Sequence, residues 1–404
     1  MKLVTLAADT VLIGQPLPFS LRDGEGFLLA KKGMVFQTRD EFNTLAANRP
    51  NFYIDRIESE LHHRTTMGRL HALITDDTQL GQFAHTQMSK AHRNPERAGP
   101  DDAATDWLNL QAQANLVLRD ANAPHFRKRL EQLQQQLEQL AKLNPDGLLL
   151  ALFQLSANEL KLYSATHAML VSAICGIAVR DVLRWPTALE HSVCQAALTM
   201  NISMTDLQDR LALQLDPPAP EQRLQIDRHA ERSVMLLDHA GVHDPLWLEA
   251  IQAHHHVASG ALALKPEGLR LARLIQRADM FAARLAPRAT RMPSSPAAAM
   301  QASYFDENRQ VDEAGAALIK AVGIYTPGSF VRLATQEIAV VVRRGRNTTT
   351  PRVAVIINRE GMPTVEPLVR DTVQREYAIV ASVAHRDVRV KLNVPRLMAL
   401  CRPD

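Results

Sequence analysis

The sequence is poor in features that would place it in several large classes of protein. Cysteine is scarce, with only Cys175, Cys194 and Cys401 among 404 residues, which argues against a disulfide-stabilised secreted fold. Charge of one sign is not in excess, because 46 basic and 43 acidic residues leave a formal net charge of +3. This balance gives little electrostatic reason to expect nucleic-acid binding, although small anionic ligands remain compatible with it.

Long apolar runs are also missing. The longest one, 168–179, is too short to cross a bilayer. The first residues, MKLVTLAADTVLIGQ, lack the apolar stretch and small-residue cleavage site of a secretory signal. We therefore expect a cytoplasmic protein with no membrane span, in which Cys175 and Cys194 pack as small hydrophobes.

What is present is an ordinary globular composition, with 46% hydrophobic and 22% charged residues, in a chain long enough for a main domain with flanking parts. Residues 1–57 carry short apolar runs separated by Gly, Pro and Asp, and one helical segment, TRDEFNTLAAN, with Thr38 as its N-cap. They predict a small mixed α/β module. Residues 58–145 predict a helical linker region, interrupted at 94–105 by Pro, Gly and Asp.

One helix is expected at 126–143, where leucines at 130, 133, 137 and 140 form an apolar stripe. This stripe can pack on the main domain or on a second subunit. Residues 146–325 have a succession of helical patterns and predict an all-α domain. Residues 326–404 predict a β-rich extension, with strands in SFVRLA, EIAVVVRR, RVAVIINR, EYAIVASVA and VRVKLNV. The fold class is therefore mainly α.

Three arginines, Arg343, Arg344 and Arg346, crowd a turn between two of these strands. Arginine clusters can bind phosphate through bidentate hydrogen bonds. The spacing does not reproduce the pattern of the PilZ type of cyclic di-GMP binder, and a solvated hairpin loop is the favoured interpretation.

The chain has 15 histidines, and several of them fall in the predicted helical domain. His239 and His243 are four residues apart, but no Glu follows the first and Gly241 lies between them, which excludes the zincin pattern. The adjacent pair His254 and His255 is more unusual, because neighbouring helix positions point about 100° apart. Histidines and a carboxylate from separate helices can assemble a metal centre without a local motif.

Five segments of the chain form an ordered set of motifs. They are YSATHAML (163–170), LQIDRHAERSVMLL (224–237), AIQAHHH (250–256), LARLIQRADMFAARLAPR (271–288) and ALIKAVGIYTPGSFVRL (317–333). In this order they are similar to motifs of the HD-GYP family of cyclic di-GMP phosphodiesterases, and the resemblance covers roughly residues 145–345.

The resemblance implies an HD-type helical bundle that holds two or three iron or manganese ions. Five residues match family metal ligands: His167, His229, His254, His255 and Asp279.

Other positions depart from the family pattern. Met200 and Asn201 stand where the family has its His-Asp pair, Met204 stands in the lysine position, and no Gly-Tyr-Pro signature follows HHH. A carboxamide cannot supply the anionic oxygen that bridges two cations, and a thioether is a poor ligand for iron or manganese. The support for a catalytic hydroxide is therefore weakened.

Three functions are compatible with this pattern. The favoured one is an inactive or weakly active signalling protein that binds a cyclic dinucleotide or a partner protein, with a homodimer as one arrangement. The second is a metal-dependent phosphodiesterase or other phosphohydrolase that uses the surviving His/Asp set. The third is a metal-free interaction domain similar to the HDOD group.

Overall fold

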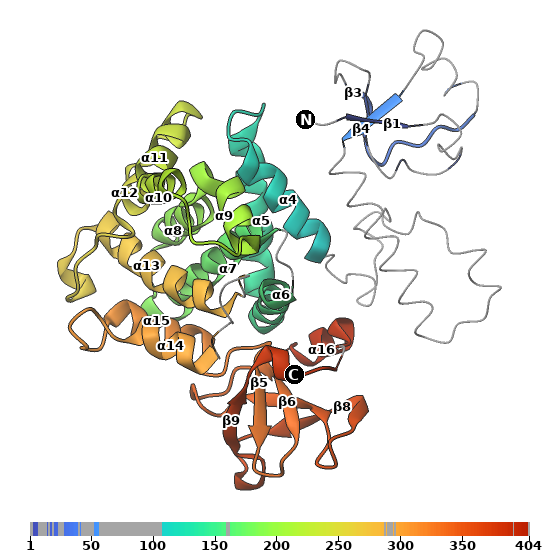
Figure 1. Ribbon diagram of the computed structural model, residues 1–404, viewed down its shortest axis with the longest axis vertical. Helices are drawn as coiled ribbons and strands as arrows, with labels where there is room; N and C mark the ends of the chain where they lie inside the picture. Colours follow the sequence, from blue (N-terminus) through green and yellow to red (C-terminus); the bar gives the residue numbers. More distant parts are fainter. Residues whose placement is uncertain are drawn as a thin grey trace. The chain divides into compact units, whose positions relative to one another are not determined.

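The computed structural model describes residues 3–6, 14, 17, 20–22, 28–38, 41, 52–55, 107–158, 162–286, 288, 294, 296–390 and 392–402 (Figure 1). The chain divides into two units, Met1–Ala112 and Gln113–Asp404. The helix α4 (Trp107–Arg119) contains the boundary. The finer division into four parts at residues 57, 145 and 325 stays a prediction.

The first unit contains an antiparallel sheet with the strand order β1-β4-β2-β3. The strands are β1 (Leu3–Leu6), β2 (Leu21–Arg22), β3 (Leu28–Ala30) and β4 (Phe52–Asp55). Thr38 accepts a hydrogen bond on Oγ1 from the backbone N–H of Glu41 at 3.2 Å, as expected of an N-cap. The rest of that predicted helix, and the predicted interruption at 94–105, lie outside the described residues.

The second unit begins with a large helical part. Its helices are α5 (Phe126–Leu143), α6 (Pro145–Asn158), α7 (Tyr163–Ile177), α8 (Thr187–Thr199), α9 (Thr205–Leu213), α10 (Pro220–Asp227), α11 (His229–His239), α12 (Pro245–Ala253), α13 (Glu267–Leu285), α14 (Pro296–Tyr304) and α15 (Glu313–Val322). Short helical turns add η4 (Ala178–Leu183), η5 (Ile202–Met204) and η6 (Leu262–Leu264).

Helix α7 lies at the centre of this part, and every one of its residues is buried. It packs against α5, α6, α8, α9 and α13. Together with η4 it forms a run, Tyr163–Leu183, that is long and apolar enough to cross a membrane, but 78% of the apolar window is buried inside the protein. The run is therefore explained as the core helix of a packed domain.

The leucine stripe of α5 packs within this chain. Leu130, Leu133 and Leu137 are buried, and α5 contacts α6, α7 and α8. The stripe therefore packs on the main domain, which is the first of the two alternatives that the sequence left open. The cysteines Cys175 and Cys194 are buried and unpaired, as predicted.

The C-terminal part is an antiparallel sheet with the order β8-β7-β6-β5-β9. Its strands are β5 (Phe330–Leu333), β6 (Ile338–Arg343), β7 (Arg352–Ile357), β8 (Pro363–Asp371) and β9 (Ile379–Val383). The structure thus confirms a helical core followed by a β-rich part. Strand β8 escaped prediction because Pro363 and Pro367 read as strand breakers, and such residues are tolerated only at a sheet edge.

The prediction of a strand at VRVKLNV was wrong. The described residues before its last valine are irregular, and α16 (Val394–Leu400) begins at that valine. Asn393 accepts a hydrogen bond on Oδ1 from the N–H of Arg396, and Pro395 occupies the first turn. An Asn cap followed by Pro starts a helix more strongly than alternating valines start a strand.

The sheet is fixed to the helical part through α6, and Figure 1 shows the two side by side. The buried side chain of Gln154 donates to the carbonyl of Gly328 at 2.8 Å. Arg344 forms an ion pair with Asp146 and also donates to the carbonyl of Ala321. Arg344 is therefore a docking residue, whereas Arg346 is exposed as a hairpin-loop residue would be.

Gly328 offers a test of this docking. It has a φ of +93°, and an added Cβ would lie 3.0 Å from Cβ of Phe153, whereas Gly361 has a φ of +80° with open space around it. Gly361→Ala should cost about 1 kcal/mol from backbone strain alone. Gly328→Ala should cost about 1–3 kcal/mol more, because it also overpacks the contact with α6. Thermal unfolding of the two variants measures the difference, and equal midpoints would contradict this account of docking.

Candidate metal centre

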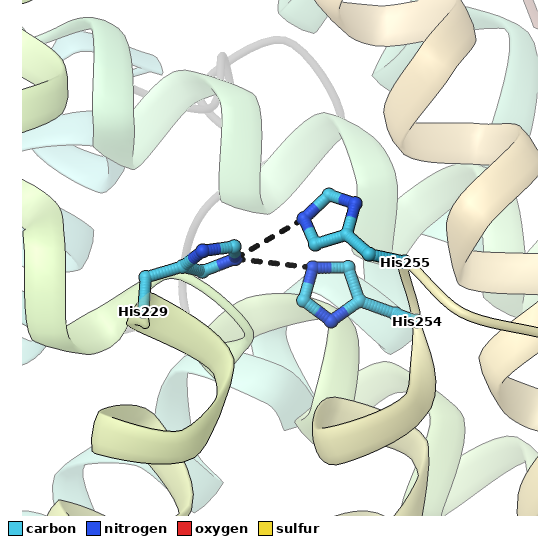
Figure 2. A group of neighbouring side chains, drawn as sticks. All are labelled: His229, His254 and His255. Atoms are coloured by element: carbon cyan, nitrogen blue, oxygen red, sulfur yellow. Dashed lines mark hydrogen bonds between the residues drawn. The ribbon is translucent and has the colours of Figure 1, made fainter. Parts of the chain in front are cut away.

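Two helices bring three histidines together. His229 is the first residue of α11, and His254 and His255 directly follow the last residue of α12. The side chains converge from these two elements, as Figure 2 shows. One ring nitrogen from each residue lies within 4.8 Å of the other two. His229 and His254 are buried and His255 is exposed, so the group opens to solvent on one side.

Helix α12 is anchored at its start and along its length. Asp244 caps it by accepting on Oδ1 from the N–H of Leu246 at 2.9 Å, and its other oxygen accepts from the hydroxyl of Ser192 on α8. The indole N–H of Trp247 donates to Thr199, also on α8, at 2.8 Å. These bonds fix the position from which His254 and His255 extend.

The backbone determines which nitrogen of each buried ring carries the proton. Nδ1 of His229 lies 2.5 Å from the carbonyl oxygen of Ile226, and Nδ1 of His254 lies 2.6 Å from that of Ile251. A carbonyl oxygen only accepts, so both Nδ1 atoms must donate. In a neutral ring the second nitrogen, Nε2, then has no proton and presents a lone pair.

These two lone pairs face each other. Nε2 of His229 lies 3.3 Å from Nε2 of His254, and it lies 3.3 Å from Nε2 of His255 as well. His255 can donate one proton to His229, but the lone pair of His254 is then left pointing at an atom that cannot donate to it. A cation held between the rings satisfies all three nitrogens, and histidine ligands commonly have their other nitrogen bonded to a carbonyl oxygen in this way.

The protonation states agree with this arrangement. Burial lowers the pKa of His254 to about 3. Loss of water around the ring is also the main cause of the lowered pKa of His229 and of His255, whose ring packs against the other two although the residue as a whole is exposed. At neutral pH the buried rings are therefore uncharged, which is the form that binds a metal.

His167 and Asp279 form a hydrogen-bonded pair beside this group. Nε2 of His167 lies 2.7 Å from Oδ1 of Asp279. Burial by itself would raise the pKa of Asp279, but the bond from His167 and the nearby His254 and His255 lower it to about 2. Asp279 is thus an anion next to the three rings. Nδ1 of His167 is buried and has no hydrogen-bond partner among the described residues.

The five residues matched from the sequence are thus placed in two neighbouring groups. His229, His254 and His255 form the cluster, and His167 and Asp279 form the adjacent pair. Their role as metal ligands stays a prediction. Among the described residues, His229, His254 and His255 form a group of three ligand side chains close enough to hold one ion.

The turn that carries Met200 and Asn201 is bonded to the helix of His229. Met200 is buried at the end of α8, and η5 follows Asn201. The hydroxyl of Ser203 donates to the carbonyl of His229 at 2.8 Å. No sequence pattern pointed to Ser203, because its partner is a backbone atom.

The segment after the histidines is held by α13. Gln276 donates to the carbonyl of His255 at 3.2 Å, and the fully buried Arg273 donates to the carbonyl of Val257 at 2.7 Å. Arg273 in turn pairs with the buried Asp312 and with Glu307. Sequence inspection missed these residues, since a buried ion network has no fixed spacing along the chain.

Comparisons with known proteins give little further information. No family model matches the chain, and no curated protein matches it. Among solved structures, it is similar to Bd1817, described as a HDG"Y"P protein from Bdellovibrio bacteriovorus. That similarity has 15% sequence identity and a TM-score of 0.38, and it covers 78% of this chain and 98% of the other. A similarity this low does not establish a shared function.

The low pKa of His254 predicts a pH dependence of stability. In the folded protein this pKa is about 3, against an ordinary value of 6.5, so the unfolded chain binds a proton first as the pH falls. The stability contributed by neutral His254 is present above pH 6.5 and is lost as the pH falls toward 3. Between pH 7.5 and 5.5 the loss should be about 1.4 kcal/mol.

Urea unfolding of chelator-treated protein, followed by helical circular dichroism, measures this loss. His254→Gln should reduce the pH dependence by that amount. His256→Gln is the matched control, because His256 is the exposed neighbour outside the cluster, and it should leave the dependence unchanged. Identical pH profiles for wild type and His254→Gln would show that the ring is not held neutral.

Proposed function

We propose that this chain is a signalling protein with a degenerate HD-type domain that binds one divalent cation. In this proposal the domain binds a cyclic dinucleotide as a regulator and does not hydrolyse it. The observation that carries the proposal is the convergence of unprotonated Nε2 atoms in the His229–His254–His255 cluster. The order of the five motif segments supports the HD type. Iron and manganese are the cations that the resemblance to the HD-GYP family implies.

The donor set fits one such cation. Imidazole nitrogens with an adjacent carboxylate suit iron or manganese, and the cluster offers three rings with the ionised Asp279 beside them. His229, His254 and His255 would hold the ion. A bound cation would supply Lewis-acid chemistry at a phosphoryl oxygen.

The donor set does not fit a second cation bridged to the first. A bridging position needs an anionic oxygen, and Asn201 is neutral at the position where the family has aspartate. Met200 is buried, and its thioether is a weak ligand for these metals. Met204 brings no positive charge for a phosphate group. These three differences favour binding over turnover.

The proposed ligand of this domain is a cyclic dinucleotide, and the proposed partner is another signalling protein. Nucleic acid is not a proposed partner, because the nearly balanced charge gives no electrostatic reason for it. A homodimer and a cytoplasmic location are retained as proposals. The buried position of Tyr163–Leu183 is consistent with a soluble protein.

Metal content tests the proposal first. Protein purified anaerobically should contain about one iron or manganese per chain by elemental analysis, since one ligand set fits one ion. The double variant His254→Gln/His255→Gln should lose the metal, because two of three ring ligands are gone. His256→Gln should retain it. The same samples should give no turnover of cyclic di-GMP.

Each other result points to a different function. Bound metal with turnover that is lost in the double variant would favour the single-metal phosphohydrolase. Protein that is metal-free, and that does not take up added Mn²⁺ or Fe²⁺, would contradict the proposed metal site and favour an interaction domain without metal.

Restoring the missing residues tests why turnover is absent. The triple variant Met200→His/Asn201→Asp/Met204→Lys should bind a second cation, because it regains an anionic bridging oxygen and a further imidazole. It should also gain measurable hydrolysis of cyclic di-GMP. Met200→Leu/Asn201→Leu, which adds no ligand, is the control. A triple variant that folds and still holds one cation would show that these positions do not limit the site.

A further inference from the structure

A second site is indicated by a large open cavity at the far end of α11. Its volume is about 880 Å³, and it lies between the turn before α5 and the second half of α11. His229 is the first residue of α11, whereas the cavity residues on this helix run from Arg232 to Ala240. At 1.5 Å per residue, the residues from Arg232 to His239 lie about 4.5 to 15 Å along the axis from His229, and none of the three cluster histidines lines the cavity. The cavity is therefore distinct from the histidine cluster.

The polar wall of the cavity is basic. His125, Arg127, Arg232 and His239 line it, and none of the described lining residues is acidic. Within the described ranges, none of these four side chains has a hydrogen bond or ion pair to the protein. Arg127 reaches from α5 to the end of α11, where its Nη1 atom lies 3.8 Å from the position of a Cβ built on Gly241. Two helices thus direct unpaired basic groups to one space.

Helix stability does not explain the basic residues at the start of α5. Helix α5 begins with FRKR and has no acidic residue in its first turn. Positive side chains at a helix N-terminus are opposed by the helix dipole, which favours anions there by about 0.3–1 kcal/mol each. An anion in the cavity would offset this unfavourable arrangement at the start of α5.

Apart from Asn122, the remaining wall is apolar. Phe126, Leu236 and the exposed Met235 line it, together with small alanines. The volume lies within the roughly 300–1,000 Å³ of small-molecule sites. Guanidinium groups match phosphate oxygens geometrically, and a phosphate monoester carries about −1.5 to −2 charges at neutral pH. The two arginines can balance that charge while the apolar wall contacts the rest of the ligand.

We propose that this cavity binds a small phosphate monoester with an apolar or planar body. The site goes beyond the function proposed for the histidine cluster and does not depend on it. Its ligand is recognised by Arg127 and Arg232 through the phosphate and by Met235 and Leu236 through the body.

Isothermal titration of the full chain with adenosine monophosphate tests the site. Adenosine monophosphate should bind, adenosine should not bind measurably, and inorganic phosphate should bind at least tenfold more weakly. Arg127→Gln/Arg232→Gln should weaken the binding of adenosine monophosphate at least tenfold. Arg346→Gln, which removes an exposed arginine from the C-terminal sheet, should not change it.

Two further variants decide the proposal. Ala123→Trp, which fills the cavity without changing charge, should also weaken binding, so the proposal does not depend on the arginine variant folding. His254→Gln/His255→Gln should bind adenosine monophosphate as the wild type does. No binding, or binding that is lost in the histidine variant but retained in the cavity variants, would overturn the proposal. Equal affinity for inorganic phosphate would overturn the role of the apolar wall.

Discussion

Two hydrogen bonds from imidazole Nδ1 to backbone carbonyls determine what the centre of this protein can do. They hold His229 and His254 as the tautomer with an unprotonated Nε2. Because both carbonyls belong to the residue three positions earlier in the chain, each bond is set by the local backbone turn. The two lone pairs then meet at 3.3 Å. Burial keeps the rings neutral, so neither Nε2 can donate to the other. A cation bound between them would remove the repulsion between the two lone pairs.

The rest of the helical part keeps these two turns in place. The buried helix α7 supplies His167, which holds Asp279 on α13, and α12 is tied to α8 through Asp244 and Trp247. The segment after His255 is fixed by Gln276 and Arg273. The same scaffold explains the loss of catalytic character that we propose. In the proposed function, the neutral side chain of Asn201 supplies no charge for a second ion.

Much of the fold was readable from the sequence, and so was the position of the histidines. Periodic leucines predicted α5, and valine-rich runs predicted β5, β6, β7 and β9. Strand β8 and helix α16 were not predicted, because prolines and an Asn cap override the local apolar pattern. At the site, the order of the motifs was enough to predict the five residues. The tautomers, the pairing of His167 with Asp279 and the bonds of Ser203 and Arg273 could not be predicted, because they depend on backbone atoms and long-range contacts. The spacing of residues along the sequence does not predict contacts of this kind.

The central claim is the unprotonated state of Nε2 in His229 and His254. Nuclear magnetic resonance of metal-free protein labelled with ¹⁵N in histidine, at neutral pH, measures the protonation of each ring nitrogen directly. The account predicts that both residues are neutral with the proton on Nδ1, and that their Nε2 signals shift when Zn²⁺ is added as a diamagnetic probe. A proton on Nε2 of both rings, or charged rings whose signals do not respond to the metal, would contradict it.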